Sequence, residues 1–285
     1  MKILIFGSRG NLGCQLTKVF SFDNEVIGWD KNDVDITDRE LVLKKVNDLK
    51  PDVIINASAY NAVDKCEDND EEYELAKKIN IDGPKFLAEA CLNVKATLIH
   101  YSSDYVFSGN KEGGYCEDDL PDPINHYGKT KFFGEKKIIE LSGKGLKWYL
   151  IRTSKLFGPK GESEVSKDSF FDIMLKLSQK KDELNVVDGE KSCFTYTPDL
   201  AQATKNLLES NKGYGIYHIT NSGSCTWYEG VVESFKLKNI NIKVNRINSD
   251  DLKRPAKRPQ NSALLNTKFT QLRNWQKALE EYLKV

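Results

Sequence analysis

Tyr127 and Lys131 have the residue types and the spacing of a proton-transfer pair. They form a YxxxK pattern in Tyr127-Gly128-Lys129-Thr130-Lys131. On a helix, side chains four residues apart share a face, so both would point into one cleft. A tyrosine hydroxyl has a pKa of about 10 in water, and a nearby ammonium group favours its ionised form. The pair therefore predicts proton exchange with a substrate oxygen while a hydride moves on carbon.

A polar run, Ser102-Ser103-Asp104, follows the strand-like segment 97–101. Open α/β sheets place reactive groups at the carboxyl ends of their strands. A hydroxyl at this position can hydrogen-bond a substrate carbonyl beside the tyrosine. A single serine at a strand end is usually only a cap. The glycine-rich turn before it and the YxxxK motif after it are what favour a functional role.

A glycine-rich turn lies between a predicted strand at 3–6 and a predicted helix at 12–20. Its glycines have the spacing GxxGxxG. Such glycines allow a tight turn, the approach of a pyrophosphate to the backbone, and close helix–strand packing. The phosphates then lie against free N–H groups at the helix N-terminus. We predict a nicotinamide dinucleotide site that includes Gly7, Arg9, Gly10, Asn11, Leu12 and Gly13, with Tyr127 and Lys131 at the nicotinamide ribose.

Residues at the end of the second predicted strand give a mixed indication of which dinucleotide binds. Asp30 follows that strand, roughly 20 residues past the glycines, where a carboxylate accepts hydrogen bonds from the adenosine ribose of NAD. Arg9 and Lys31 could instead pair with the 2′-phosphate of NADP. The sequence therefore predicts NADP or NAD, with use of both possible.

The first half of the chain alternates short apolar runs with amphipathic stretches. This alternation predicts an α/β fold, a doubly wound parallel sheet of the Rossmann type covered by helices on both faces. The predicted strands are 3–6, 25–29, 53–56, 96–102 and 147–152, and the predicted helices are 12–20, 38–49, 71–91 and 126–141.

After Arg152 this alternation becomes less regular. We predict short strands at 184–187, 215–219 and 242–247, and helices at 170–180, 198–208, 227–237 and 267–283. The predicted division is an NAD(P)-binding Rossmann domain over 1–155 and a small C-terminal substrate-binding lobe over 156–285. Some elements at about 184–220 are expected to return to the Rossmann sheet.

Composition excludes several classes of partner. The 285 residues contain 42 Lys plus Arg and 42 Asp plus Glu, so the net charge is zero. Nucleic acids and acidic membranes both select a basic surface, so neither is expected as a partner. No apolar run approaches the ~20 residues of a membrane helix, and no signal peptide is expected. The six cysteines are scattered without a CxxC pair, which favours reduced thiols in a cytoplasmic protein and no zinc site.

Several segments together resemble the dTDP-4-dehydrorhamnose reductase family of the extended short-chain dehydrogenase/reductases. The similar segments are 56–67 (NASAYNAVDKCE), 100–109 (HYSSDYVFSG), Tyr127-Gly128-Lys129-Thr130-Lys131 with Gly134-Glu135, Arg152-Thr153-Ser154, 258–262 (RPQNS) and Leu265-Asn266-Thr267. The resemblance extends over nearly the whole chain.

The resemblance implies an NAD(P)H-dependent reduction of the 4-keto group of a nucleotide-linked 6-deoxyhexose. It implies Tyr127 as the acid, Lys131 as its partner and Ser103 as the catalytic hydroxyl. Further cofactor contacts are implied for Asp35, Ile36, Ala57, Ser58, Ala59 and Tyr60. Substrate contacts are implied for Ser103, Asp104, Val106, Thr153 and Ser154. Arg258 either approaches the substrate phosphates or only fixes the tail.

The chain also departs from the family pattern. Lys155 stands where the family commonly has tryptophan, and 188–199 differs from the family's run after its strand. Lys155 stands at the border of the substrate lobe and 188–199 lies within it, so the sugar and the nucleotide stay open. Some family members dimerise through a metal held by glutamates, one of them near position 15. Gln15 stands there, so no metal site is predicted, and either a monomer or a homodimer is expected.

Two other functions remain as alternatives. One is a non-catalytic dinucleotide-binding subunit, similar to the regulatory subunit of methionine adenosyltransferase. The intact Ser103, Tyr127 and Lys131 argue against it. The other is a nucleotide-sugar epimerase or dehydratase. A dehydratase usually has acidic residues next to its catalytic hydroxyl, and no glutamate follows Asp104.

Overall fold

The centre of the protein is a six-stranded parallel sheet with the strand order β2-β1-β3-β4-β5-β9. This is a computed structural model, and it describes residues 1–164, 166–210 and 212–284. The order reverses direction next to β1, as in a doubly wound fold, which confirms the predicted class. The strands are β1 (Lys2–Phe6), β2 (Glu25–Trp29), β3 (Val53–Asn56), β4 (Thr97–Ser103), β5 (Lys147–Thr153) and β9 (Gly215–His218).

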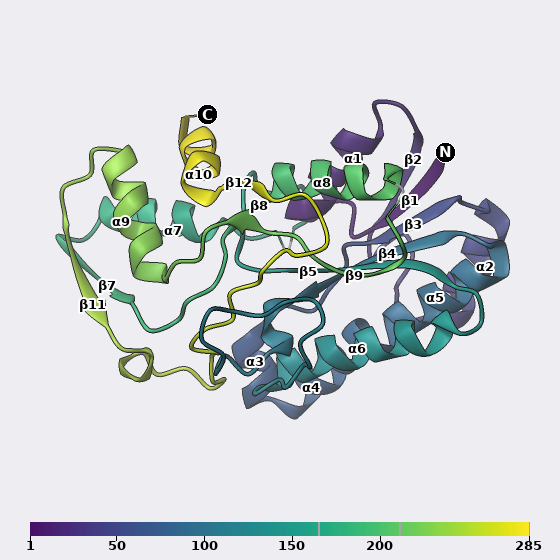
Figure 1. The fold of residues 1–285 in the computed structure, drawn as a ribbon, viewed down its shortest axis with the longest axis horizontal. Coiled ribbons are helices and arrows are strands. Elements are labelled where there is room, and N and C mark those ends of the chain that lie inside the picture. The colour runs from purple at the N-terminus through teal and green to yellow at the C-terminus, as the bar shows by residue number, and fades with distance from the viewer. Residues whose placement is uncertain (165, 211, 285) are drawn as a thin grey trace.

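Helices cover both faces of this sheet (Figure 1). On one face α1 (Asn11–Phe20) and α8 (Thr197–Glu209) bury their apolar sides, for example Leu16 and Leu207. On the other face α2 (Arg39–Leu49), α5 (Gly83–Val94) and α6 (His126–Ser142) do the same. The inner strands β1 and β3 are almost entirely apolar and buried, because helices cover both of their sides.

The predicted helix at 71–91 is interrupted. The structure divides this region into α4 (Asp70–Lys77), one π-helical turn (Lys78–Asp82) and α5, with α3 (Val63–Asp68) just before them. Turns of this kind occur frequently at functional sites.

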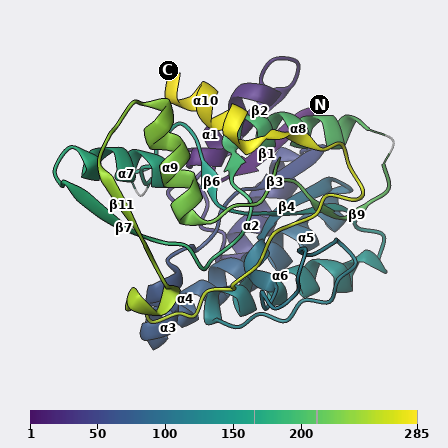
Figure 2. The ribbon, with the colours of Figure 1, turned by 60° about the vertical axis from the view of Figure 1, so that its left-hand side comes forward.

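The rest of the chain forms a smaller lobe beside the carboxyl ends of the strands (Figure 2). Its centre is an aromatic cluster that includes Phe157, Phe171, Phe194 and Trp275. The strand β9 lies at the edge of the main sheet, whereas β7 pairs with β11 in the lobe. The lobe contains α7 (Phe170–Ser178), β7 (Glu183–Val187), α9 (Trp227–Leu237), β11 (Lys243–Ile247), α10 (Trp275–Lys284) and the short strands β6 (Leu156–Phe157), β8 (Thr195–Tyr196), β10 (Asn221–Ser222) and β12 (Leu272–Asn274).

The predicted closing helix at 267–283 is wrong at its start, because α10 begins at Trp275. The Asn274 side chain accepts a hydrogen bond from the Gln276 N–H at 2.9 Å, which favours a helix start here. Thr267 is engaged elsewhere, since its hydroxyl donates to Glu117 at 2.6 Å. Among the described residues, no helix is long and apolar enough to cross a bilayer.

A buried ion pair connects α6 to the middle of the sheet. The Arg152 guanidinium on β5 donates to both carboxylate oxygens of Glu135 on α6, at 2.9 and 2.7 Å. Both residues are 1% exposed, and the guanidinium carbon lies 5.1 Å from the centre of the Phe107 ring. A bidentate pair removed from water fixes the position of α6 on β5.

Removing one partner of this pair should destabilise the fold strongly. We expect Arg152→Met to lower the free energy of unfolding by about 3–5 kcal/mol, because the Glu135 carboxylate is left buried and unpaired. Urea denaturation measures the change. The double variant Arg152→Met/Glu135→Leu should recover much of the loss, since it buries no lone charge. Equal stability of wild type and Arg152→Met would contradict the prediction.

Candidate active site

The helix α6 brings Tyr127 to the end of β4. The Asn125 side chain begins this helix by accepting the Gly128 N–H at 2.7 Å. A Cβ atom at Gly128 would lie 2.2 Å from the carbonyl oxygen of Tyr105, so only glycine allows this close approach. The rings of Tyr105 and Tyr127 are 5.7 Å apart, edge to face.

Ser103 lies beside the hydroxyl of Tyr127. Burial raises the pKa of Tyr127 to about 12, and hydrogen bonding with the Ser103 hydroxyl lowers it by a smaller amount. The phenol is therefore protonated at neutral pH and can act as an acid. Ser103 also accepts the Tyr105 N–H at 3.1 Å, which fixes its side chain.

Lys131 is almost completely buried one turn further along α6. Its ammonium group donates to the Tyr101 carbonyl oxygen at 2.7 Å. Burial lowers the pKa of Lys131 to about 8, and the charge of Glu135 opposes that shift. The pKa of the neighbouring His100 is well below its usual value, because of burial and the charge of Lys131. Within the part of the chain that the structure describes, a single hydrogen bond holds this buried ammonium group, so its other donors are left for a ligand.

The predicted substrate contacts lie close to Ser103. The Asp104 carboxylate accepts from Ser262 at 2.6 Å and from Ser103 at 3.1 Å. Burial raises the pKa of Asp104, while the hydroxyls of Ser262, Ser154 and Ser103 act in the other direction. Thr153 is the partner of Ser103 in the β4–β5 register. Four predicted substrate residues, at or just after the ends of β4 and β5, therefore lie close together.

The other two predicted substrate residues, Val106 and Arg258, make contacts away from Ser103. Val106 is fully buried in a small cluster with Phe107 and Tyr115. Arg258 donates to both oxygens of Asp64 on α3, at 2.8 and 2.7 Å. The contact seen for Arg258 is thus the one that fixes the tail, and its contact with substrate phosphates stays a prediction.

The glycine-rich turn forms a backbone cradle between β1 and α1. Gly7 has φ +73°, and a Cβ there would lie 2.8 Å from the Ser58 nitrogen. A Cβ at Gly13 would lie 2.0 Å from the Gly7 carbonyl oxygen. The residue before α1 is Gly10, and no side chain among the described residues caps the helix, so N–H groups of its first turn are left for an anion. These residues fit a dinucleotide pyrophosphate.

The register of the strands gathers the other predicted cofactor residues at the same edge. Phe6 of β1 is level with Trp29 and Asn56, so the turn at Gly7, Asp30 and the segment 57–60 follow side by side. Of these, Ala59 and the neighbouring Lys31 are exposed. Asp35 accepts from the backbone N–H and the hydroxyl of Thr37 at 2.9 and 2.7 Å. Ile36 is buried against α5, Leu12 is buried in the first turn of α1, and Arg9 is exposed.

Asn80, in the π-helical turn, is a positioning residue that the sequence analysis missed. Its amide accepts from the Tyr60 N–H and donates to the Tyr60 carbonyl oxygen, both at 3.0 Å. It also donates to the Thr130 hydroxyl at 3.0 Å. Asn80 therefore joins the segment 57–60 to the helix of Tyr127. An asparagine inside an otherwise regular helical pattern was the available signal.

A loop from the lobe also covers the glycine-rich turn, a contact that no motif in the sequence indicates. We call residues 159–164 and 166–168 the covering loop. Its Ser163 N–H donates to the Arg9 carbonyl oxygen at 2.8 Å. The Asn11 side chain accepts from the Gly161 N–H at 2.9 Å and donates to the Lys167 carbonyl oxygen at 3.0 Å.

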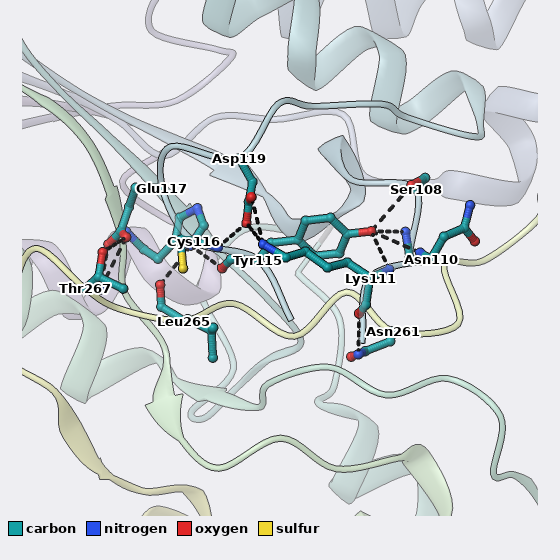
Figure 3. A network of polar contacts seen from close by, with 12 residues as sticks. Ser108, Asn110, Lys111, Tyr115, Cys116, Glu117, Asp119, Asn261, Leu265 and Thr267 are labelled. Carbon is teal, nitrogen blue, oxygen red and sulfur yellow. Dashed lines mark hydrogen bonds and ion pairs between the residues drawn. The ribbon is translucent and has the colours of Figure 1, made fainter. Parts of the chain in front are cut away.

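The segment before α6 is held by a polar network (Figure 3). The Tyr115 hydroxyl accepts three consecutive backbone N–H groups, from Gly109, Asn110 and Lys111, at 2.9, 3.0 and 3.2 Å. Glu117 accepts from the backbone and hydroxyl of Thr267. The tail of the chain is thus tied to the region between β4 and α6. Within the described ranges, no group of three His, Cys, Asp or Glu side chains could hold a metal ion.

The buried ammonium of Lys131 should make stability depend on pH. In the folded chain the pKa of Lys131 is about 8, against 10.5 for an ordinary lysine. Between these values the unfolded chain binds the proton and the folded chain does not, so stability rises with pH. We expect the unfolding free energy of wild type minus that of Lys131→Met to rise by up to about 1.4 kcal/mol per pH unit in this window.

Urea denaturation over this pH range measures that difference. Subtraction removes the groups common to both proteins. Lys136→Met, which changes an exposed lysine of the same helix, is the matched control and should give a flat difference. A flat difference for Lys131→Met as well would refute the assigned burial of its charge.

Comparison with known proteins agrees with this geometry. Residues 1–285 match the family model described as RmlD substrate binding domain. A dTDP-4-dehydrorhamnose reductase of Aggregatibacter actinomycetemcomitans is 36% identical over 299 residues, which cover 98% of this chain and 97% of that protein.

Solved structures give the same result. A dTDP-4-dehydrorhamnose reductase from Clostridium acetobutylicum has a TM-score of 0.90 and 40% identity, covering 100% of this chain and 99% of that one. The enzyme of that name from Bacillus anthracis, solved in complex with NADP, has a TM-score of 0.91 and 32% identity, covering 99% and 98%. The chain therefore belongs to the dTDP-4-dehydrorhamnose reductase family.

Proposed function

We propose that this chain is an NAD(P)H-dependent oxidoreductase that reduces the 4-keto group of a nucleotide-linked 6-deoxyhexose. The observation that carries the proposal is the junction of β4 and α6, where Ser103 lies beside a protonated Tyr127 and the buried Lys131 follows one turn later. The names of the full-length relatives support a reductase rather than a regulatory subunit, an epimerase or a dehydratase.

In the proposed mechanism, reduced nicotinamide supplies the hydride when the cofactor is bound. Tyr127 donates its proton to the substrate oxygen. The Ser103 hydroxyl, which donates to Asp104 in the structure, turns to donate its hydrogen bond to the same substrate oxygen. Lys131 uses its free donors on the ribose hydroxyls, and its charge favours the tyrosinate that remains. Asp104, held by Ser262, orients a sugar hydroxyl.

The proposal also includes the roles of the two regions of the chain, its cellular compartment and its partners. The region 1–155 binds the cofactor, and 156–285 mainly binds the nucleotide sugar. The protein works in the cytoplasm as a monomer or homodimer and does not bind nucleic acid. The aromatic cluster of the lobe supports the division, because it gives the lobe a core of its own.

The direct test is a substrate panel. The purified protein is incubated with dTDP-, UDP- and GDP-linked 4-keto-6-deoxyhexoses and with NADPH or NADH, and nicotinamide absorbance is followed. We expect loss of absorbance with at least one sugar. Tyr127→Phe should lower kcat by about two decades or more, since it removes the proton donor.

Tyr214→Phe is the control for this variant, because Tyr214 is 52% exposed and lies just before β9. It should react at the wild-type rate. An unchanged rate for Tyr127→Phe would refute the assigned acid, and no oxidation with any sugar would refute the reductase function.

The covering loop should slow release of the cofactor. A Cβ at Gly161 would lie 2.5 Å from the Arg9 carbonyl oxygen, so Gly161→Val should push the loop from the glycine-rich turn. We expect dinucleotide dissociation to become about tenfold faster, from the loss of one or two hydrogen bonds.

Stopped-flow displacement of fluorescent NADPH measures this rate. Gly143→Val is the control, since a Cβ at Gly143 meets no atom within 4 Å. Equal dissociation from Gly161→Val and wild type would show that the loop does not hinder release.

A further inference from the structure

Charged side chains of both signs surround the turn that follows β2. Asp30 and Asp33 carry carboxylates on this turn, and Lys31 lies between them. Arg9 reaches the turn from the glycine-rich loop, and its guanidinium Nη2 is 3.8 Å from the Asp33 carboxylate. The adenosine ribose of a dinucleotide in the glycine cradle would lie beside these groups, because it follows the end of β2.

Both carboxylates on this turn accept a backbone N–H, since the Asp30 Oδ1 accepts from Lys31 at 2.8 Å, but Asp33 is the one in contact with Arg9. The Asp33 carboxylate is fixed as follows. Its Oδ2 accepts the backbone N–H of Asp30 at 2.8 Å, and the Asp33 N–H donates back to the Asp30 carbonyl oxygen at 2.9 Å. This reciprocal pair fixes the Asp33 charge at the turn. Arg9 is held more loosely, since its contact with Asp33 is long and both side chains are exposed.

We propose that Asp33 determines the preference of this chain between NADH and NADPH. The 2′-phosphate of NADPH needs a cation, and Arg9 is the guanidinium placed to supply one. The fixed carboxylate of Asp33 competes for that guanidinium and repels the phosphate. NADH carries no 2′-phosphate and meets neither effect, so Asp33 disfavours NADPH selectively. This inference rests on the proposed dinucleotide site.

The test is the variant Asp33→Asn. The amide oxygen of asparagine can still accept the Asp30 N–H, so the turn is kept while the charge is removed. We expect the Kd of NADPH to fall about tenfold, as for one unit charge near a doubly charged phosphate at the surface, and the Kd of NADH to change less than about twofold. Fluorescence of the bound reduced nicotinamide measures both constants without any sugar.

Three further measurements sharpen the result. Asp23→Asn removes an exposed carboxylate that pairs with Lys205, and it should leave the ratio of the two constants unchanged. In an Arg9→Gln background the gain from Asp33→Asn should shrink, because the competed guanidinium is absent. Added salt should reduce the gain, since these charges are exposed.

The outcomes separate the two proposals. If wild type binds both dinucleotides and Asp33→Asn leaves their ratio unchanged, the role of Asp33 is refuted and the reductase proposal stands. An equal change in the Kd values of NADH and NADPH also refutes the role of Asp33, because such a change would come from a distorted turn and not from the lost charge. Asp33→Ser, which also keeps an acceptor for the Asp30 N–H, must reproduce the shift. If neither dinucleotide binds to wild type, the proposed function itself fails.

Discussion

A buried ammonium group, that of Lys131, is the constraint on which the catalytic region depends. Removing a cation from water is unfavourable unless its donors and its charge are compensated. Here a strand carbonyl supplies one acceptor, and Glu135 supplies negative charge while it is itself bound by Arg152. The position of α6 against β4 and β5 follows from this chain of contacts. The hydroxyl groups of a ligand would supply acceptors for the remaining donors of the Lys131 ammonium group.

The zero net charge of the chain is consistent with an anionic cofactor and substrate, because positive charge is needed only locally. At the sheet edge the uncapped N-terminus of α1, Arg9 and Lys131 supply it. Carboxylates accompany these cations at short range, with Asp33 near Arg9 and Glu135 near Lys131. Each of these cations therefore has a carboxylate beside it. An anionic ligand must either compete with that carboxylate for the cation or bind next to it.

Short-range patterns in the sequence were enough for the class of fold, the glycine-rich turn and the spacing of Tyr127 and Lys131. The expected contacts of Asp35, the segment 57–60, Thr153 and Ser154 came only from the family resemblance. Apolar runs between glycines and helical stretches specify a parallel sheet, and its register aligns the strand ends. The long-range contacts were not accessible in this way. Asn80 reaches Tyr60 and Thr130, and Gly161 reaches Asn11, across separations that no local pattern encodes. The start of α10 was missed because Thr267 bonds to a distant glutamate.

The returning tail has a consequence for the order in which the protein matures during synthesis. Domains generally form from the N-terminus as the chain emerges from the ribosome. The sheet strands β1 to β5 are made well before Arg258, Ser262 and Thr267, which later bind Asp64, Asp104 and Glu117. A nascent chain can therefore form these strands before Ser262 is available to donate its hydrogen bond to the Asp104 carboxylate. The catalytic edge is completed late, by residues that have no part in the sheet.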